Sequence, residues 1–322
     1  MIGMIMLKKK QREQEEIDAK IKVLKRAAQN ADRTNFTSML WKSAPEVSRY
    51  LKGYRLTGMD ISYTEEYVND ALPRFFHTMD FIPLNGRNRI LELGANPYLF
   101  SILLMKLFDH KLEFANFFDE NIYETKISSL TQEMTNDYFD ETIKFNSNIF
   151  NLERTNPYPY KQNSFDMVLC CEVLEHLVLS PFEVFNQVYK ILKPGGRLIL
   201  TLPNAVRLSN LGSMLIGQNI FDKFHKVVHG RHNREYTLEE IRTLATKYGY
   251  EIEKLETRDR FDYDLVDMHS VAYNGINKLP YTKKYLLELL TSLDQTVENR
   301  GDNIYLAAVK PKQKKLAGFF KK

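Results

Sequence analysis

The sequence of 322 residues predicts an α/β protein whose core is a mostly parallel sheet flanked by helices. Two observations predict this class. Short apolar segments alternate with segments of helical periodicity from Asn88 to Pro203, which is typical of βαβ units because neighbouring parallel strands need a long crossover. In addition, 43% of the residues are hydrophobic and 27% are charged, which is ordinary for a globular domain with a buried core.

We expect seven strands, each a short apolar segment. In chain order they are residues 89–94, 111–118, 142–150, 164–171, 195–203, 251–258 and 303–310. Helical periodicity predicts helices over residues 100–108, 126–137, 172–192, 237–250 and 282–300. Thr237 is a candidate N-cap for the helix at 237–250, and Gly249 lies near its end. Ligand sites in such sheets cluster at the carboxyl ends of the strands, so polar residues there are candidate site residues.

Helices are also expected before the sheet. Thr64, followed by two glutamates, is a candidate helix start. A helix over residues 12–29 carries an apolar stripe of Ile17, Ile21, Leu24 and Ala28. This stripe packs either on its own domain or on a second subunit. In the second case the N-terminal helices would form a homo-oligomer.

The chain is expected to divide into a helical extension at 1–84, a main domain at 85–311 with an insertion at 204–235, and a basic tail at 312–322. The tail is either solvated or in weak contact with a membrane surface or nucleic acid. Because the net charge of +4 is mild and Lys and Arg are spread along the chain, a small molecule or glycan is a more expected partner than nucleic acid. The N-terminal residues do not follow the order of a secretory signal, in which basic residues precede an apolar stretch. The two adjacent cysteines suit a reducing compartment, so we expect a cytoplasmic protein.

Three segments follow one another in an informative order. The first, "LELGANPY" (91–98), is a strand end, a glycine turn and a helix start, and such a turn lets the backbone approach a ligand. The others are "NSFDMVLCCEVLEHL" (163–177) and "VYKILKPGGRLILTLPN" (188–204). Together they resemble the motifs of the class I S-adenosylmethionine-dependent methyltransferases, whose fold is Rossmann-like. The resemblance covers residues 85–257.

The resemblance implies that S-adenosyl-L-methionine binds at the ends of the first, second and fourth strands. Gly94 keeps the first glycine of the family's turn, whereas Asn96 and Tyr98 stand where later glycines are usual. Either Asn116 or Asp119 would hold the ribose hydroxyls, and the sequence leaves both open. The positions that match the family's cofactor contacts are Glu92, Gly94, Asn96, Asn116, Asp119, Asn148 and Cys171. Among them, Asn148 would take the adenine edge.

Residues 170–177, "CCEVLEHL", place Glu172, Glu175 and His176 at positions i, i+3 and i+4 after an apolar strand. If a helix begins there, the three side chains can face one small volume. Acidic residues also favour a helix start because of the helix dipole alone. The segment by itself is therefore compatible with a simple helix start or with a site.

A second segment, "GRHNREYTLEEI" (230–241), adds His232. The combination of Glu-x-x-Glu-His with a later His-x-x-Glu resembles two metal-dependent branches of the family, the 2′-O-methyltransferases of small RNAs and the O-methyltransferases of ubiquinone biosynthesis. The resemblance implies that a divalent ion (Mg²⁺, Mn²⁺ or Zn²⁺) is held by Glu172, Glu175, His176 and His232. The alternative is a hydrogen-bonded polar cluster in which His176 or His232 acts as general base.

Three acceptor classes remain for an O-methyltransferase: a sugar hydroxyl of a glycan or its precursor, an RNA end, and a small aromatic such as a catechol or quinol. The sequence as a whole resembles bacterial methyltransferases of glycan biosynthesis, so we expect a sugar hydroxyl as the acceptor. The insertion offers polar and aromatic side chains for it, namely Asn204, Arg207, Asn210, Arg231, Asn233, Phe221 and Phe224. His225 and His229 would shape the substrate pocket, act as general base or lie exposed in a loop. A non-catalytic scaffold that binds the cofactor stays open as another class.

Overall fold

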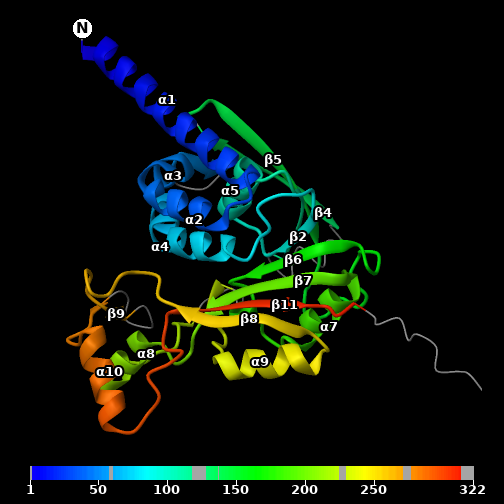
Figure 1. Ribbon diagram of the computed structural model, residues 1–322, viewed down its shortest axis with the longest axis vertical. Helices are drawn as coiled ribbons and strands as arrows, with labels where there is room; N and C mark the ends of the chain where they lie inside the picture. Colours follow the sequence, from blue (N-terminus) through cyan, green and yellow to red (C-terminus); the bar gives the residue numbers. More distant parts are fainter. Residues whose placement is uncertain are drawn as a thin grey trace, which may run out of the picture.

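The structure is a computed structural model that describes residues 2–57, 61–117, 128–136, 138–224, 230–270 and 277–312. Its centre is a nine-stranded sheet (Figure 1). In sheet order the strands are β1 (Tyr54–Leu56), β4 (Ser129–Asn136), β5 (Glu141–Ile149), β3 (Lys111–Asn116), β2 (Arg89–Leu93), β6 (Phe165–Cys171), β7 (Leu192–Pro203), β11 (Asn303–Val309) and β8 (Glu251–Arg258). The predicted α/β class with a mostly parallel sheet is confirmed.

All seven predicted strands are present, as β2, β3, β5, β6, β7, β8 and β11. The predicted number was nevertheless wrong, because β1 and β4 extend the sheet beyond β5. The predicted helix at 126–137 was wrong too, since residues 129–136 form β4. This strand pairs with β5 along its whole length, and its buried positions Met134 and Asn136 alternate with more exposed ones. Ladder pairing there overrides local helix propensity.

The five central strands β5, β3, β2, β6 and β7 run parallel, so their carboxyl ends lie at one edge of the sheet. Strand β11 is antiparallel to both of its neighbours, β7 and β8. The side chains of each strand alternate between two apolar layers. Ile90 and Met167 face one layer, while Leu91 and Val168 face the other.

Helices cover both faces of the sheet (Figure 1). The first layer contains α1 (Ile2–Gln29), α2 (Arg33–Lys42), α3 (Ala44–Lys52), α4 (Ile61–Met79) and α5 (Leu99–Leu107). The second contains α7 (Phe182–Ile191) and α9 (Leu238–Lys247). None of the helices that the structure describes is both long and apolar enough to cross a membrane.

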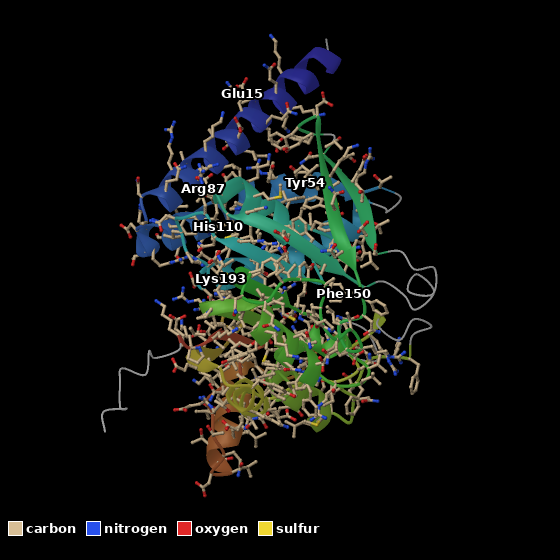
Figure 2. The ribbon with its side chains drawn as sticks, turned by 90° about the vertical axis from the view of Figure 1, so that its right-hand side faces the viewer. Glu15, Tyr54, Arg87, His110, Phe150 and Lys193 are labelled. Atoms are coloured by element: carbon tan, nitrogen blue, oxygen red, sulfur yellow. The ribbon has the colours of Figure 1, made fainter. Side chains whose placement is uncertain are left out.

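The apolar stripe of α1 packs on helices of its own chain. Ile17, Ile21, Leu24 and Ala28 are buried, and α1 contacts α2, α3 and α5. The extension also adds β1, where Tyr54 (labelled in Figure 2) is buried and donates a hydrogen bond to Glu141 Oε2 of β5 at 2.5 Å. These contacts favour a helix that covers its own domain over one that pairs with a second subunit.

Two helix starts and one helix end test the capping predictions. Thr237 caps α9 in a reciprocal capping box with Glu240, as predicted. Thr64 does not start a helix, because it lies buried inside α4. The helix predicted over 282–300 is α10 (Lys283–Ser292), which ends earlier because Asp294 takes a left-handed conformation (φ 53°) while Gln295 N donates to Leu290 O.

A smaller apolar cluster lies beside the open end of the sheet. It joins α8 (Leu208–Leu215) and α10 to the short strands β9 (His269–Ser270) and β10 (Asn277–Lys278). Its buried members are Leu208, Met268, Leu279, Leu286 and Leu290. Leu208 comes from the insertion after β7 and the other four from the chain after β8, so these two segments share a small core.

Leu24 tests the role of α1 in the fold. Truncating Leu24 to Ala removes a fully buried side chain, and we expect a loss of about 2–5 kcal/mol in the free energy of unfolding, measured by denaturant titration. Val23→Ala is the matched control, because Val23 is 42% exposed and its loss should cost no more than about 0.5 kcal/mol. Equal stability of the two variants would contradict the packing of α1 on the domain.

Candidate functional site

A cleft of about 330 Å³ opens at the carboxyl ends of β2, β3, β5 and β6. This volume is at the lower end of the range for small-molecule sites. Gly94 and Asn96 line it from the turn after β2, and Asn116 lines it from the end of β3. Glu172 and His176 line it from the segment after β6. The cleft therefore lies where the parallel sheet predicts a ligand site.

Gly94 is required at this turn for two reasons. Its φ is +71°, a left-handed conformation that is costly for residues with a Cβ. In addition, a Cβ at this position would lie 2.5 Å from Val173 Cγ2. The Gly94 N–H donates to Ala115 O at 2.8 Å, which ties the turn to β3.

Asn116 organises the same turn from the neighbouring strand. Its Oδ1 accepts from Asn96 N at 3.1 Å, and its Nδ2 donates to Tyr98 OH at 2.8 Å and Ser147 Oγ at 3.0 Å. Asn116 is buried but still lines the cleft. The competing candidate Asp119 lies outside the described residues, as do His225 and His229.

Three further candidates are absent from the described cleft lining. Glu92 is buried beneath the turn, where Ser101 Oγ donates to Oε2 at 2.6 Å and burial raises the pKa of the carboxyl to about 7. Asn148 donates to Tyr160 OH at 2.8 Å. Cys171 ends β6, and burial raises the pKa of its thiol to about 12.

Sequence reasoning missed the residues that line the cleft after β3 and β5. They are Phe117, Asn151, Leu152 and Glu153. Glu153 Oε1 accepts from Leu179 N and from Ser180 N, which fixes the segment after β6 against the segment after β5. These residues directly follow predicted strands, and this position could have identified them, because ligands bind at the carboxyl ends of parallel strands.

The segment after β6 does not form the expected helix. Glu172 has a left-handed conformation (φ 53°), Leu174–His176 make a single 3₁₀ turn (η1), and a longer helix begins only with α7 at Phe182. As a result Glu172 does not share the direction of the two later side chains. Its carboxylate accepts from Thr201 Oγ1 at 2.8 Å and from Asn303 Nδ2 at 3.1 Å.

Arg74 of α4 also reaches Glu172. The Arg74 side chain is buried, and its Nε lies 3.7 Å from Glu172 Oε2. Burial opposes the charged form of Arg74, but the Glu172 charge and Tyr67 together raise its pKa, so this guanidinium stays charged. The N-terminal extension thereby contributes a cation directly beneath the segment that carries Glu175.

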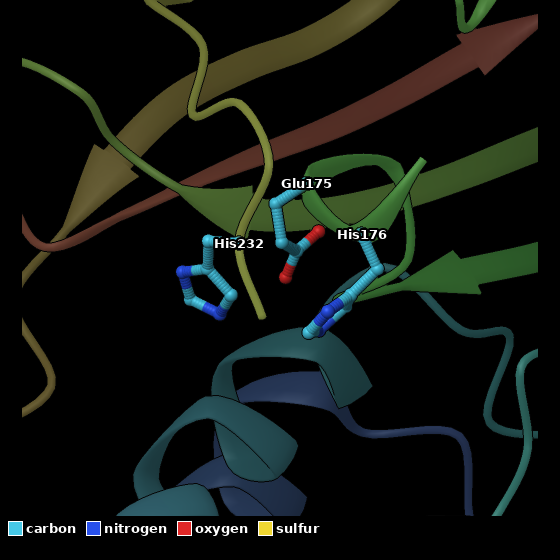
Figure 3. A group of neighbouring side chains, drawn as sticks. All are labelled: Glu175, His176 and His232. Carbon is cyan, nitrogen blue, oxygen red and sulfur yellow. The ribbon is translucent and has the colours of Figure 1, made fainter. Parts of the chain in front are cut away.

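Glu175, His176 and His232 do converge, with one ligand atom of each within 4.8 Å of the others. Figure 3 shows the three side chains pointing toward one small space. The imidazole centroids of His176 and His232 are 5.0 Å apart. Glu172, the fourth predicted ligand, is not a member of this group among the described residues.

Main-chain hydrogen bonds bring the two halves of the cluster together. Asn233 N and Arg234 N donate to Glu175 O at 2.6 and 3.2 Å, and Asn233 Nδ2 donates to His176 O at 2.9 Å. His176 Nδ1 donates to Arg231 O at 3.0 Å. With Nδ1 protonated, the lone pair of the neutral His176 ring is on Nε2.

The ionisable groups of the cluster have shifted pKa values. Glu175 is fully buried, and neither carboxylate oxygen has a hydrogen-bond partner among the described residues. Burial, and then the Glu172 charge, raise the pKa of Glu175 well above its usual value. Burial and the neighbouring His232 lower the pKa of His176. Burial opposes the charged form of His232, but Glu235 and Glu175 raise its pKa to about 9.

These residues fit a divalent cation. A buried carboxylate without donors is costly as an anion unless a cation lies against it. One carboxylate and two imidazoles are ligand types that Mn²⁺ and Zn²⁺ accept, and three protein ligands leave positions open for other molecules. Of the four predicted ligands, Glu175, His176 and His232 converge, whereas Glu172 is hydrogen-bonded to Thr201 and Asn303.

The sequence profile of the methyltransferase domain family matches residues 53–255. The chain belongs to this family. The match includes the residues that line the cleft, every member of the cluster and the strands of the sheet except β11 and the end of β8. The expected class of fold is confirmed independently by a solved S-adenosylmethionine-dependent methyltransferase from Archaeoglobus fulgidus, with a TM-score of 0.50 at 16% identity, over 77% of this chain and 98% of that one.

Two curated relatives match part of this chain. An uncharacterised protein of Methanocaldococcus jannaschii is 30% identical over 138 residues, which is 39% of this chain and 54% of the relative. The mitochondrial ubiquinone biosynthesis O-methyltransferase of Dictyostelium discoideum is 27% identical over 148 residues, 44% of this chain and 42% of the relative. The chain therefore spans about half the length of each relative.

Gly94 allows a matched test of the cleft. Gly94→Ala and Gly217→Ala place a Cβ at nearly the same φ, +71° and +72°, and both should lose about 1–2 kcal/mol of stability from backbone strain. A Cβ at Gly217 meets no atom within 4 Å, whereas one at Gly94 meets Val173. Calorimetry should show binding of S-adenosylhomocysteine to Gly217→Ala and its loss in Gly94→Ala. Full affinity of Gly94→Ala would exclude this turn from the cofactor site.

Proposed function

We propose that the protein is an S-adenosylmethionine-dependent O-methyltransferase that uses a divalent cation held by Glu175, His176 and His232. The observation that carries this proposal is the buried Glu175 carboxylate, which has no hydrogen-bond donor among the described residues and lies between two imidazoles. His176 belongs to this cluster and also lines the cleft that contains Gly94. Cofactor and cation would therefore meet at one end of the cleft.

The cleft has the features that a nucleoside with an amino-acid tail requires. Gly94 leaves room for the ligand, and Asn96 and Asn116 offer polar groups beside it. Leu152, Val173 and Leu177 supply apolar walls. The cofactor itself supplies a methyl group activated by a sulfonium. The residues of the chain orient it, since methyl transfer depends chiefly on in-line positioning.

The cluster suits activation of a hydroxyl group. An alcohol is a poor nucleophile at neutral pH, and a divalent cation supplies the Lewis acidity that lowers the pKa of a hydroxyl. With a single carboxylate and two imidazoles, the donor set favours Mn²⁺ or Zn²⁺ over Mg²⁺, which prefers oxygen ligands. Glu172, with Arg74, would hold the segment that carries Glu175 and His176.

We propose a sugar hydroxyl with a neighbouring oxygen as the acceptor, on a glycan or glycan precursor. Fewer side chains of the insertion are available to bind a sugar than the sequence suggested. Asn204, Arg207 and Asn210 are buried and hold the insertion together through Gly301 O, Glu235 and Ala205 O. Aromatic side chains remain for a ring, with Phe221 68% and Phe224 91% exposed and Arg231 over the Phe224 ring.

A small aromatic diol is the second candidate acceptor. Two observations favour it. A relative that is 27% identical is named for ubiquinone biosynthesis. In addition, the insertion that carries His232 exposes two aromatic side chains, Phe221 and Phe224, and these suit a flat apolar ring.

The cation site is tested by its histidine. His232→Ala should weaken binding of Mn²⁺ or Zn²⁺ by at least about tenfold, because the substitution removes one of the three protein ligands. The affinity is measured by calorimetry. Affinity for S-adenosylhomocysteine should stay near that of the wild type. His269→Ala is the control, since His269 is exposed on β9. Full methyl transfer in excess chelator would refute the cation and leave His176 or His232 as general base.

The acceptor is tested with radiolabelled cofactor and three pools: nucleotide sugars with glycan extracts, catechols, and small RNAs. We expect label in the sugar pool when Mn²⁺ is present, and a loss of that label on chelation. Label in the catechol pool alone would replace the sugar by the aromatic acceptor. Label on RNA alone would also overturn the sugar proposal, and label on amines would overturn O-methylation.

A further inference from the structure

Carboxylates hold His232 at two points. Its backbone N–H donates to Asp222 Oδ2 at 2.8 Å, and its ring Nδ1 donates to Glu235 Oε1 at 3.2 Å. Because Nδ1 carries this bond, Nε2 is the nitrogen that can bind a metal ion. The ring therefore has a defined orientation before any ion arrives.

Glu235 is in turn held by two buried side chains from the start of the insertion. Its second oxygen, Oε2, accepts from Arg207 Nη1 at 2.5 Å and from Asn210 Nδ2 at 3.2 Å. The positive charge of Arg207 balances the carboxylate, so the pair can be largely removed from water. Arg207 Nη1 also donates to Asn204 O at 3.0 Å, which fixes the guanidinium to the end of β7.

The two imidazoles of the cluster are oriented by different means. His176 uses a main-chain carbonyl, that of Arg231, as the acceptor for its Nδ1. His232 instead uses a side chain that depends on two others, Arg207 and Asn210. A backbone carbonyl cannot be removed by substitution, whereas the Glu235 carboxylate that accepts the hydrogen bond from His232 can.

We propose that Glu235, held by Arg207 and Asn210, is a positioning residue that fixes the ring of His232 for metal binding. This inference rests on the proposed cation site. Metal-binding histidines commonly donate their second ring N–H to a carboxylate or a carbonyl, which sets the tautomer and makes the ligand more basic. This hydrogen-bond relay, from Arg207 and Asn210 through Glu235 to His232, joins the start of the insertion to its end.

The decisive substitution is Glu235→Gln in the full-length protein. A glutamine can accept from His232 through its oxygen, but its amide NH₂ then faces the donors of Arg207 and Asn210. It also lacks the charge that makes the imidazole a stronger ligand. We expect the Kd for Mn²⁺ or Zn²⁺ to rise about 10–100-fold by calorimetry. The visible absorption of the Co²⁺-loaded protein should shift, and affinity for S-adenosylhomocysteine should not change.

Glu240→Gln is the matched control. Glu240 lies five residues further on and bonds to Thr237 and Arg234 rather than to a member of the cluster. Its loss should lower the melting temperature while leaving the metal Kd and the Co²⁺ spectrum unchanged. If Glu235→Gln does not melt cooperatively, Asn210→Ala removes one arm of the relay, and we expect weaker metal binding there too.

The outcomes separate the two proposals. Metal binding by Glu235→Gln and by Asn210→Ala with the affinity and Co²⁺ spectrum of the wild type would overturn the relay and leave the cation site intact. No binding of Mn²⁺, Zn²⁺ or Co²⁺ to the wild-type protein would overturn the cation site, and the relay with it. A lowered melting temperature with an unchanged metal Kd would assign Glu235 a purely structural role.

Discussion

The site depends on the return of residues 230–236 to the turn after β6. Two backbone N–H groups of this segment donate to Glu175 O, and a parallel bridge between Asn204 and Tyr236 closes the base of the insertion. The Glu175 carboxyl group beside these bonds is fully buried and has no hydrogen-bond donor among the described residues. Burial favours its neutral form, whereas a cation bound beside it would favour the carboxylate.

The helical extension is part of the same arrangement. Arg74 reaches from α4 to Glu172, whose other partners, Thr201 and Asn303, come from β7 and β11. Glu172 thus connects the extension to three strands of the sheet at the point where the chain turns with a positive φ. Because Arg74 is buried, loss of the Glu172 carboxylate would leave an unpaired buried charge, which is costly. The turn after β6 is accordingly held from both faces of the sheet.

The sequence predicted the elements that depend on neighbouring residues, and it did not predict those that depend on contacts between distant residues. Apolar segments and the capping box of Thr237 were predicted because neighbouring residues determine them. β4 was not, since its pairing with β5 is decided by the sheet. Glu172, Glu175, His176 and His232 were grouped through family motifs. Three of them converge, whereas Glu172 points elsewhere because the chain does not form the expected helix after β6. The burial of Arg207 and its bond to Glu235 depend on contacts 28 residues apart, which no local pattern indicates.

The outer edge of the sheet has a consequence for solubility. Beyond β5 the sheet continues with β4 and ends in β1, a strand of only three residues that pairs with one part of β4. A long strand with unpaired backbone groups is a template for pairing with another chain, and natural proteins shield such edges. Because β1 belongs to the extension that also brings Arg74 to the site, a chain shortened to the catalytic sheet would expose β4 and become prone to aggregate.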